Sequence, residues 1–157
     1  MPRQRLARRI NATVVAWALG VMVVDTVTKW WARRHLTGHA RHVVGPLWLR
    51  LTYNSGISFS LNRTGPVVTT LVALVIVLAV LYVAVQAMPG LPTIGFGLLL
   101  GGGVGNEVDR LVRVPHQVTD FVSIGWFPVF NAADAAVTVG FGVLVLALMR
   151  GSVLVAR

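Results

Sequence analysis

Cysteine is absent from this chain of 157 residues, and charged residues are scarce. Without thiols, the chain cannot form disulfides, thiolate metal sites or a cysteine nucleophile. Only 12% of the residues carry a charge and 55% are hydrophobic, whereas soluble domains have roughly a quarter of their residues charged. The composition therefore predicts a single membrane-embedded domain over residues 1–157.

Acidic residues are also few. The chain has 5 of them against 14 lysines and arginines, which gives a net charge of +9. A basic excess can serve nucleic acid binding on one face of a soluble scaffold. It can also place basic residues against anionic lipid headgroups at the ends of membrane spans. Most arginines here flank long apolar runs. We therefore predict membrane lipid as a partner and no nucleic acid.

Long apolar runs predict an α-helical integral membrane protein with four transmembrane helices, at residues 10–31, 66–88, 93–113 and 130–149. The uncharged stretch 64–106 is too long for one span of about 20 residues, and a Pro-Gly-Leu-Pro turn at 89–92 divides it. The first run follows four arginines, as in a secretory signal peptide, but it lacks a small-residue cleavage site. We therefore expect this first span to be retained.

Four spans place both termini on the same side of the membrane. The arginines before the first span, Arg3, Arg5, Arg8 and Arg9, predict that this side is cytoplasmic. In the outer segment, apolar and polar residues alternate from Leu47 to Tyr53. A turn at Asn54-Ser55-Gly56, followed by Ile57, Phe59 and Leu61, predicts a small extracytoplasmic β-hairpin.

Each of the five carboxylates needs a physical account, because an ionised carboxylate in hydrocarbon costs about 2.5–3.5 kcal/mol on insertion scales. They are Asp25, Glu107, Asp109, Asp120 and Asp134. Asp25 lies one helical turn before Lys29. This spacing predicts a salt bridge that lets both residues approach the outer interface. The alternative is that the pair holds another helix.

The third span ends in a mixture of amide and charged side chains. Asp109 and Arg113 have the spacing of an ion pair on one helix face. Asn106 and Arg110 have the same spacing. Two interpretations stay open for them: a capped helix end, or a stripe that binds a peptide carbonyl or a lipid headgroup.

Asp120 and Asp134 stand on either side of a short outer segment. Asp134 is one turn into the fourth span, about 6 Å below its start, and the returning chain can bring the two carboxylates together. In contact, they would share a proton. One could then activate a water while the other polarises a carbonyl, without metal or cofactor. On spacing alone, two unrelated polar residues remain the alternative.

Five stretches in this order resemble lipoprotein signal peptidase (signal peptidase II) of bacteria, over nearly the whole chain. They are Asp25-Thr-Val-Thr-Lys29, Asn54-Ser-Gly-Ile-Ser-Phe59, Gly105-Asn-Glu-Val-Asp-Arg110, Val118-Thr-Asp-Phe121 and Phe130-Asn-Ala-Ala-Asp134. The resemblance implies four helices and a small β-cradle in the bacterial inner membrane. Together with the cytoplasmic termini predicted from the arginines, this leads us to expect the active site toward the outer face.

The resemblance also implies an aspartic endopeptidase that removes the signal peptide from diacylglyceryl-modified prolipoproteins, just before the lipidated cysteine. It assigns catalysis to Asp120 and Asp134, with no metal or cofactor, and implies inhibition by globomycin-type compounds. Residues that match positions around the substrate are Asn54, Asn106, Arg110 and Asn131. Residues that match supporting positions are Asp25, Lys29, Gly56 and Asp109.

Two departures from the family pattern bear on specificity. Glu107 stands where the family usually has an apolar residue, and the stretch around His116 is unusually polar. Other functions fit parts of the pattern less well. A transporter needs its acids near the midplane, whereas these cluster toward the outer face.

A metal site and a nucleotide site are also disfavoured. A metal site at His35, His39 and His42 would have basic neighbours and no nearby carboxylate. Glycines recur every four residues in the third span, at Gly97, Gly101 and Gly105. This recurrence favours close helix packing over a nucleotide site.

Overall fold

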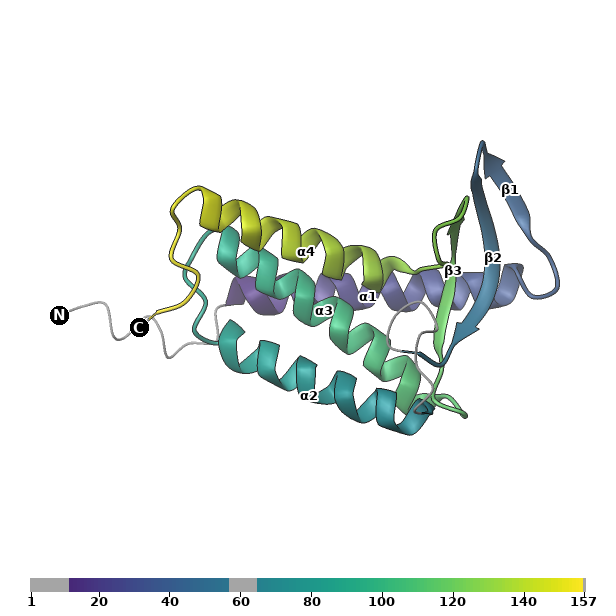
Figure 1. Ribbon diagram of the computed structural model, residues 1–157, viewed down its shortest axis with the longest axis horizontal. Helices are drawn as coiled ribbons and strands as arrows, with labels where there is room; N and C mark the ends of the chain where they lie inside the picture. The colour runs from purple at the N-terminus through teal and green to yellow at the C-terminus, as the bar shows by residue number, and fades with distance from the viewer. Residues whose placement is uncertain (1–11, 57–64, 157) are drawn as a thin grey trace.

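The computed structural model describes residues 12–56 and 65–156, and in them four helices lie side by side with a small sheet at one end (Figure 1). The helices are α1 (Ala12–His35), α2 (Pro66–Ala84), α3 (Leu91–Val112) and α4 (Ala132–Met149). The strands are β1 (Arg41–Val44), β2 (Leu47–Asn54) and β3 (Val118–Ile124). The N-terminal arginines on which the orientation was predicted lie outside the described residues.

The four helices occupy nearly the predicted ranges, but they are not equally apolar. Within the described residues, α1, α2 and α4 are long and apolar enough to cross a membrane. Although α3 has 22 residues, its last turns carry charged side chains, and it is the helix with the most buried residues. It also contacts each of the other three helices. The fold is therefore a helical membrane-type bundle with α3 at its centre.

Glycines allow α3 to pack closely against its neighbours. A Cβ atom at Gly97 would lie 2.5 Å from the Trp17 Cβ, and one at Gly101 would lie 2.6 Å from the Ala18 carbonyl oxygen. A Cβ at Gly105 would lie 2.8 Å from the Asp25 carboxylate. The predicted packing role of these three glycines is confirmed, since all of them face α1.

The small sheet differs from the predicted hairpin in its strand pairing. β2 covers the alternating residues, but its antiparallel partners are β1, across a turn at Gly45, and β3, from the segment before α4. The predicted second strand at Ile57, Phe59 and Leu61 lies outside the described residues. The sequence alternation identified β2 correctly but could not identify its partners, because strand pairing is non-local.

The sheet rests on the last turns of α1. Ala32 of α1 and Leu36, which directly follows this helix, form a buried apolar cluster with Phe121 of β3. At the opposite end of the bundle, the turn between α2 and α3 pairs with the C-terminal segment, where Met88 N donates to Leu154 O at 2.9 Å. The packing of α1 against β3 fixes where the neighbour of Phe121, Asp120, stands relative to the helices.

Candidate active site

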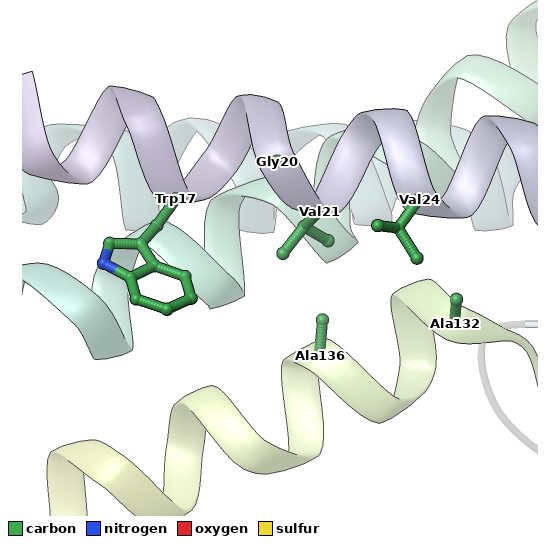
Figure 2. A pocket seen from close by; sticks show the side chains of 6 residues that line it. All are labelled: Trp17, Gly20, Val21, Val24, Ala132 and Ala136. Atoms are coloured by element: carbon green, nitrogen blue, oxygen red, sulfur yellow. The ribbon is translucent and has the colours of Figure 1, made fainter.

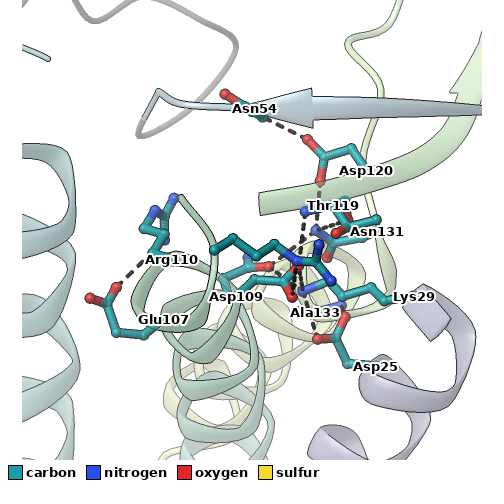
Figure 3. Close-up of polar contacts among 12 residues, drawn as sticks. Asp25, Lys29, Asn54, Glu107, Asp109, Arg110, Thr119, Asp120, Asn131 and Ala133 are labelled. Atoms are coloured by element: carbon teal, nitrogen blue, oxygen red, sulfur yellow. Dashed lines mark hydrogen bonds and ion pairs between the residues drawn. The ribbon is translucent and has the colours of Figure 1, made fainter. Parts of the chain in front are cut away.

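The predicted site residues come together at the end of the bundle that carries the sheet (Figure 3). They come from α1, β2, α3, β3 and the start of α4. The residues linked there by hydrogen bonds or ion pairs are Asp25, Lys29, Asn54, Gly56, Asn106, Asp109, Arg110, Asp120, Asn131 and Asp134.

Backbone pairing brings Asp120 next to the start of α4. Phe130 N donates to Val122 O at 2.9 Å, and Val122 N donates to Phe130 O at 2.8 Å, so the chain that leaves β3 returns beside it. Asn131 therefore lies against Asp120, and its Nδ2 donates to Asp120 Oδ1 at 2.6 Å. The returning chain thus brings the start of α4 against β3, as the sequence spacing of Asp120 and Asp134 predicted.

Asn131 also caps α4 through a reciprocal pair of hydrogen bonds with Asp134. Its Oδ1 accepts from Asp134 N at 2.9 Å, and its own backbone N donates to Asp134 Oδ2 at 3.1 Å. This is a capping box, which satisfies two backbone donors that a helix start otherwise leaves free. The single residue Asn131 consequently contacts both candidate catalytic carboxylates, Asp120 and Asp134.

Asn106 holds the other oxygen of Asp134. Its Nδ2 donates to Asp134 Oδ1 at 2.8 Å, while its Oδ1 accepts from Lys29 Nζ at 2.9 Å. Asn131 Nδ2 also lies 3.1 Å from Asn106 Oδ1. The Asn106 amide therefore faces the interior of the protein, and its oxygen and nitrogen are fixed by the groups around them.

Asp25 and Lys29 form the predicted salt bridge, with 2.7 Å between Lys29 Nζ and Asp25 Oδ2. Both side chains are almost fully buried inside the bundle. The reason is that each has a partner inside the bundle. Asp25 Oδ1 accepts from Ala133 N at 3.1 Å, so α1 holds the N-terminus of α4. The salt bridge and the helix-holding role occur together.

Asp109 connects α3 to its surroundings through several cations. The predicted ion pair with Arg113 is confirmed, with 3.1 Å between Nε and Oδ1. Lys29 Nζ lies 3.6 Å from Asp109 Oδ2, and the same oxygen accepts from Thr119 N at 2.9 Å. The sequence pattern did not single out Thr119, although it directly precedes Asp120. Asp109 thus fixes the strand residue next to the candidate catalytic carboxylate.

Asn54 and Arg110 meet at Gly56. Asn54 Nδ2 donates to Asp120 Oδ2 at 3.2 Å, and its Oδ1 accepts from Gly56 N at 2.8 Å. Arg110 Nη2 donates to Gly56 O at 3.3 Å. Asn106 and Arg110, although predicted on one helix stripe, therefore engage different partners. His116, in the polar stretch, donates from Nδ1 to Arg110 O at 2.8 Å near the end of α3.

The environment of Asp120 favours its protonated form. Asp120 is only 2% exposed. Burial is the larger cause that raises the pKa of Asp120 to about 7, and the negative charge of Asp134 is the second. Hydrogen bonds from Asn131 and Asn54 act in the opposite direction. Asp134 is only partly buried. One carboxylate is therefore buried and keeps its proton up to about neutral pH, and the other is partly accessible.

The three histidines considered for a metal site engage backbone carbonyls of their own segments. The ring Nδ1 atoms of His35 and His39 lie 2.9 Å from the carbonyl oxygens of Trp31 and Thr37, respectively. His42 Nε2 lies 2.9 Å from Gly45 O. Each contact occupies one ring nitrogen. Among the described residues, no three His, Asp or Glu side chains are grouped so that they could hold a metal ion.

An apolar groove lies between α1 and α4 (Figure 2). Its volume is about 330 Å³. The residues that line it are Trp17, Gly20, Val21, Val24, Ala132 and Ala136. One end of the groove, at Val24 and Ala132, is adjacent in sequence to Asp25 and Asn131. The polar site and an apolar surface groove therefore meet at the same end of α4.

A helical membrane bundle that holds two carboxylates on one shared asparagine contains the groups that an aspartic peptidase requires. The model of a known family, described as signal peptidase (SPase) II, matches residues 17–150. This chain belongs to that family of aspartic peptidases.

Similar proteins include the lipoprotein signal peptidase of Mycolicibacterium smegmatis, 40% identical over 94% of this chain. The chain spans 63% of the length of that relative. The lipoprotein signal peptidase of Mycobacterium avium is 36% identical over 96% of this chain and 85% of its own length. A solved structure, titled as a bacterial membrane enzyme, aligns with a TM-score of 0.78 and 25% identity over 89% of each chain.

Proposed function

We propose that this protein is a lipoprotein signal peptidase in which Asp120 and Asp134 act as a catalytic pair. The observation that carries the proposal is their shared partner, because Asn131 bonds to the side chain of Asp120 at 2.6 Å and caps α4 together with Asp134. The negative charge of Asp134 also raises the pKa of Asp120, as expected for two carboxylates that titrate as a coupled pair. Family membership and the names of the relatives support the same activity.

The two carboxylates take different roles. Asp134 accepts hydrogen bonds on both oxygens and is partly exposed, which suits the ionised partner that takes a proton from the attacking water. Asp120 retains its proton and donates it to the oxygen of the scissile carbonyl as the water oxygen bonds to the carbonyl carbon. When the C–N bond breaks, the proton on Asp134 passes to the leaving nitrogen. In the same collapse, one hydroxyl of the tetrahedral intermediate returns a proton to Asp120 and becomes the carbonyl of the new carboxyl terminus.

The substrate in this proposal is a prolipoprotein whose signal peptide is cut just before a diacylglyceryl-modified cysteine. Asn54 contacts Asp120, and Arg110 contacts the Gly56 carbonyl next to Asn54, so that both side chains can hold the peptide backbone. Asn106 and Asn131 orient the two carboxylates, because Asn106 donates to Asp134 and Asn131 donates to Asp120. Acyl chains of the modified cysteine remain in the apolar environment around the helices, and globomycin-type compounds compete for the same position.

The membrane orientation follows from the same site. We propose that all four helices cross the bacterial inner membrane, with the sheet at the outer face and both termini in the cytoplasm. Exposed tryptophans at the sheet end support this placement, since this residue type favours the membrane–water boundary. They are Trp30, Trp48 and Trp126. A scissile bond at the outer edge of the bilayer would then reach Asp120 and Asp134.

Cleavage of a diacylglyceryl-modified prolipoprotein by the purified protein in lipid tests this function. The expected result is a single cut before the lipidated cysteine, blocked by globomycin and absent in Asp120→Asn. The same peptide without the diacylglyceryl group should be cleaved much more slowly, because the lipid supplies positioning energy. Equal turnover of both peptides would show that the substrate assignment is wrong. Loss of activity in a chelator, restored by zinc, would contradict the metal-free mechanism.

A further inference from the structure

Glu107 is a buried acid that the mechanism above does not use. It is 4% exposed, and its carboxylate faces Arg110, one turn later on α3, which is 6% exposed (Figure 3). The distance between Arg110 Nη1 and Glu107 Oε2 is 3.6 Å. Among the described residues, neither Glu107 oxygen nor Arg110 Nε has a hydrogen-bond partner. The pair is therefore held by charge rather than by directed hydrogen bonds.

Glu107 is the acid available to neutralise Arg110. The neighbouring Asp109 is already paired with Lys29, Arg33 and Arg113. Within the part of the chain that the structure describes, the ion pair of Arg110 is with Glu107 alone. A buried guanidinium without a counter-charge is strongly unfavourable, so removal of the Glu107 charge should drive the Arg110 side chain toward solvent.

Arg110 is the start of a continuous path to Asp120. Its Nη2 donates to Gly56 O at 3.3 Å, and Gly56 N donates to Asn54 Oδ1 at 2.8 Å. Asn54 Nδ2 then donates to Asp120 Oδ2 at 3.2 Å. Two side chains and one glycine therefore link an acid at the side of α3 to the carboxylate in the strand.

We propose that Glu107 is a positioning residue that acts through Arg110. Its charge retains the guanidinium in the protein, the guanidinium holds the Gly56 carbonyl, and this contact keeps Asn54 against Asp120. The catalytic meaning of this inference rests on the proposed function, whereas the link between Glu107 and Gly56 does not.

The kinetic test compares Glu107→Gln, which preserves shape, with Glu107→Asp, which preserves charge. We expect kcat/KM to fall about tenfold in Glu107→Gln, with a partial recovery in Glu107→Asp. The effect should vanish when Arg110 is already Gln, because residues that act through one another are not additive. Val108→Ala, at a neighbouring residue that is 43% exposed, is the matched control and should leave kcat/KM unchanged. Full activity in Glu107→Gln, or additive losses with Arg110→Gln, would overturn the proposal.

A second measurement does not depend on turnover. The chain has no cysteine, so a spin label at Ser55→Cys, an exposed position beside Gly56, reports this segment alone. Glu107→Gln and Arg110→Gln should each increase the label mobility, with no further increase in the double variant, and Val108→Ala should not change it. Unchanged mobility in Glu107→Gln would refute the link to Gly56. Should Asp120→Asn remain active, the proposed function would fail while this spectroscopic result would still stand.

Discussion

The Nδ2 atom of Asn131 lies 2.6 Å from the Oδ1 atom of Asp120, although one residue begins a helix and the other belongs to a strand. The contact exists because Phe130 pairs with Val122 and returns the chain to β3. Asn131 also caps α4 with Asp134. One asparagine therefore couples the two carboxylates, and its position sets the geometry on which the proposed chemistry depends.

The proposed pair predicts that Asp120→Asn and Asp134→Asn each reduce cleavage to below about 1% of normal, with no further loss in the double variant, since residues that act as a unit are non-additive. Both changes preserve side-chain shape, so thermal unfolding in detergent should change little. Steady-state cleavage of a lipidated prolipoprotein measures the effect. A single variant that retains more than about a twentieth of normal activity would remove that residue from the pair.

The raised pKa of Asp120 predicts an alkaline limb in the pH–rate profile. Above pH 7, Asp120 loses the proton that it donates to the substrate, so kcat/KM should fall with a midpoint at about pH 7. A profile of kcat/KM between about pH 5 and pH 9 measures this limb. A flat profile across neutral pH would contradict the assigned role of Asp120.

The same pKa shift predicts a change in stability. The folded state holds the Asp120 proton more tightly than the unfolded chain, whose pKa is 3.8. The stabilisation is therefore complete below about pH 3.8 and is lost as pH rises through about 7. In Asp120→Asn, the free energy of unfolding should depend less on pH in this window than in the parent protein.

The buried salt bridge predicts a large stability loss in Asp25→Ala. This change leaves Lys29 buried without its 2.7 Å partner and Ala133 N without its acceptor. Breaking a buried pair on one side costs about 3–5 kcal/mol. Asp25→Asn keeps an oxygen for Ala133 N and should cost less. Thermal unfolding of both variants in detergent measures the difference, and equal stability of Asp25→Ala and the parent would show that the pair is dispensable.

Close packing of α3 on α1 predicts that Gly101→Ala is destabilising. The added Cβ would lie 2.6 Å from the Ala18 carbonyl oxygen, and overpacking of this kind costs about 1–3 kcal/mol. Gly142→Ala is the matched control, because nothing lies within 4 Å of a Cβ there. It should be neutral or slightly stabilising. If both variants unfold at the same temperature, the glycine at position 101 is not required for packing.

The sequence alone determined the helices and the acids of interest. Apolar runs and a Pro-Gly-Leu-Pro turn mark the helices because hydropathy and turn chemistry are local properties of the chain. The predicted ion pairs of Asp25 with Lys29 and of Asp109 with Arg113 are present, since residues one turn apart meet on any helix. Five carboxylates in an apolar chain drew attention to the site because each carries a cost in lipid.

Tertiary structure decided which residues meet. The partners of β2 come from segments before and after it in the chain, and no local alternation encodes that pairing. Asp25 reaches Ala133 across 108 residues, and Asn54 reaches Asp120 across 66. Buried polar groups must find partners wherever the fold provides them. Composition therefore identified these side chains as costly, and only the packing of α1, α3, α4 and β3 determined the partners that offset that cost.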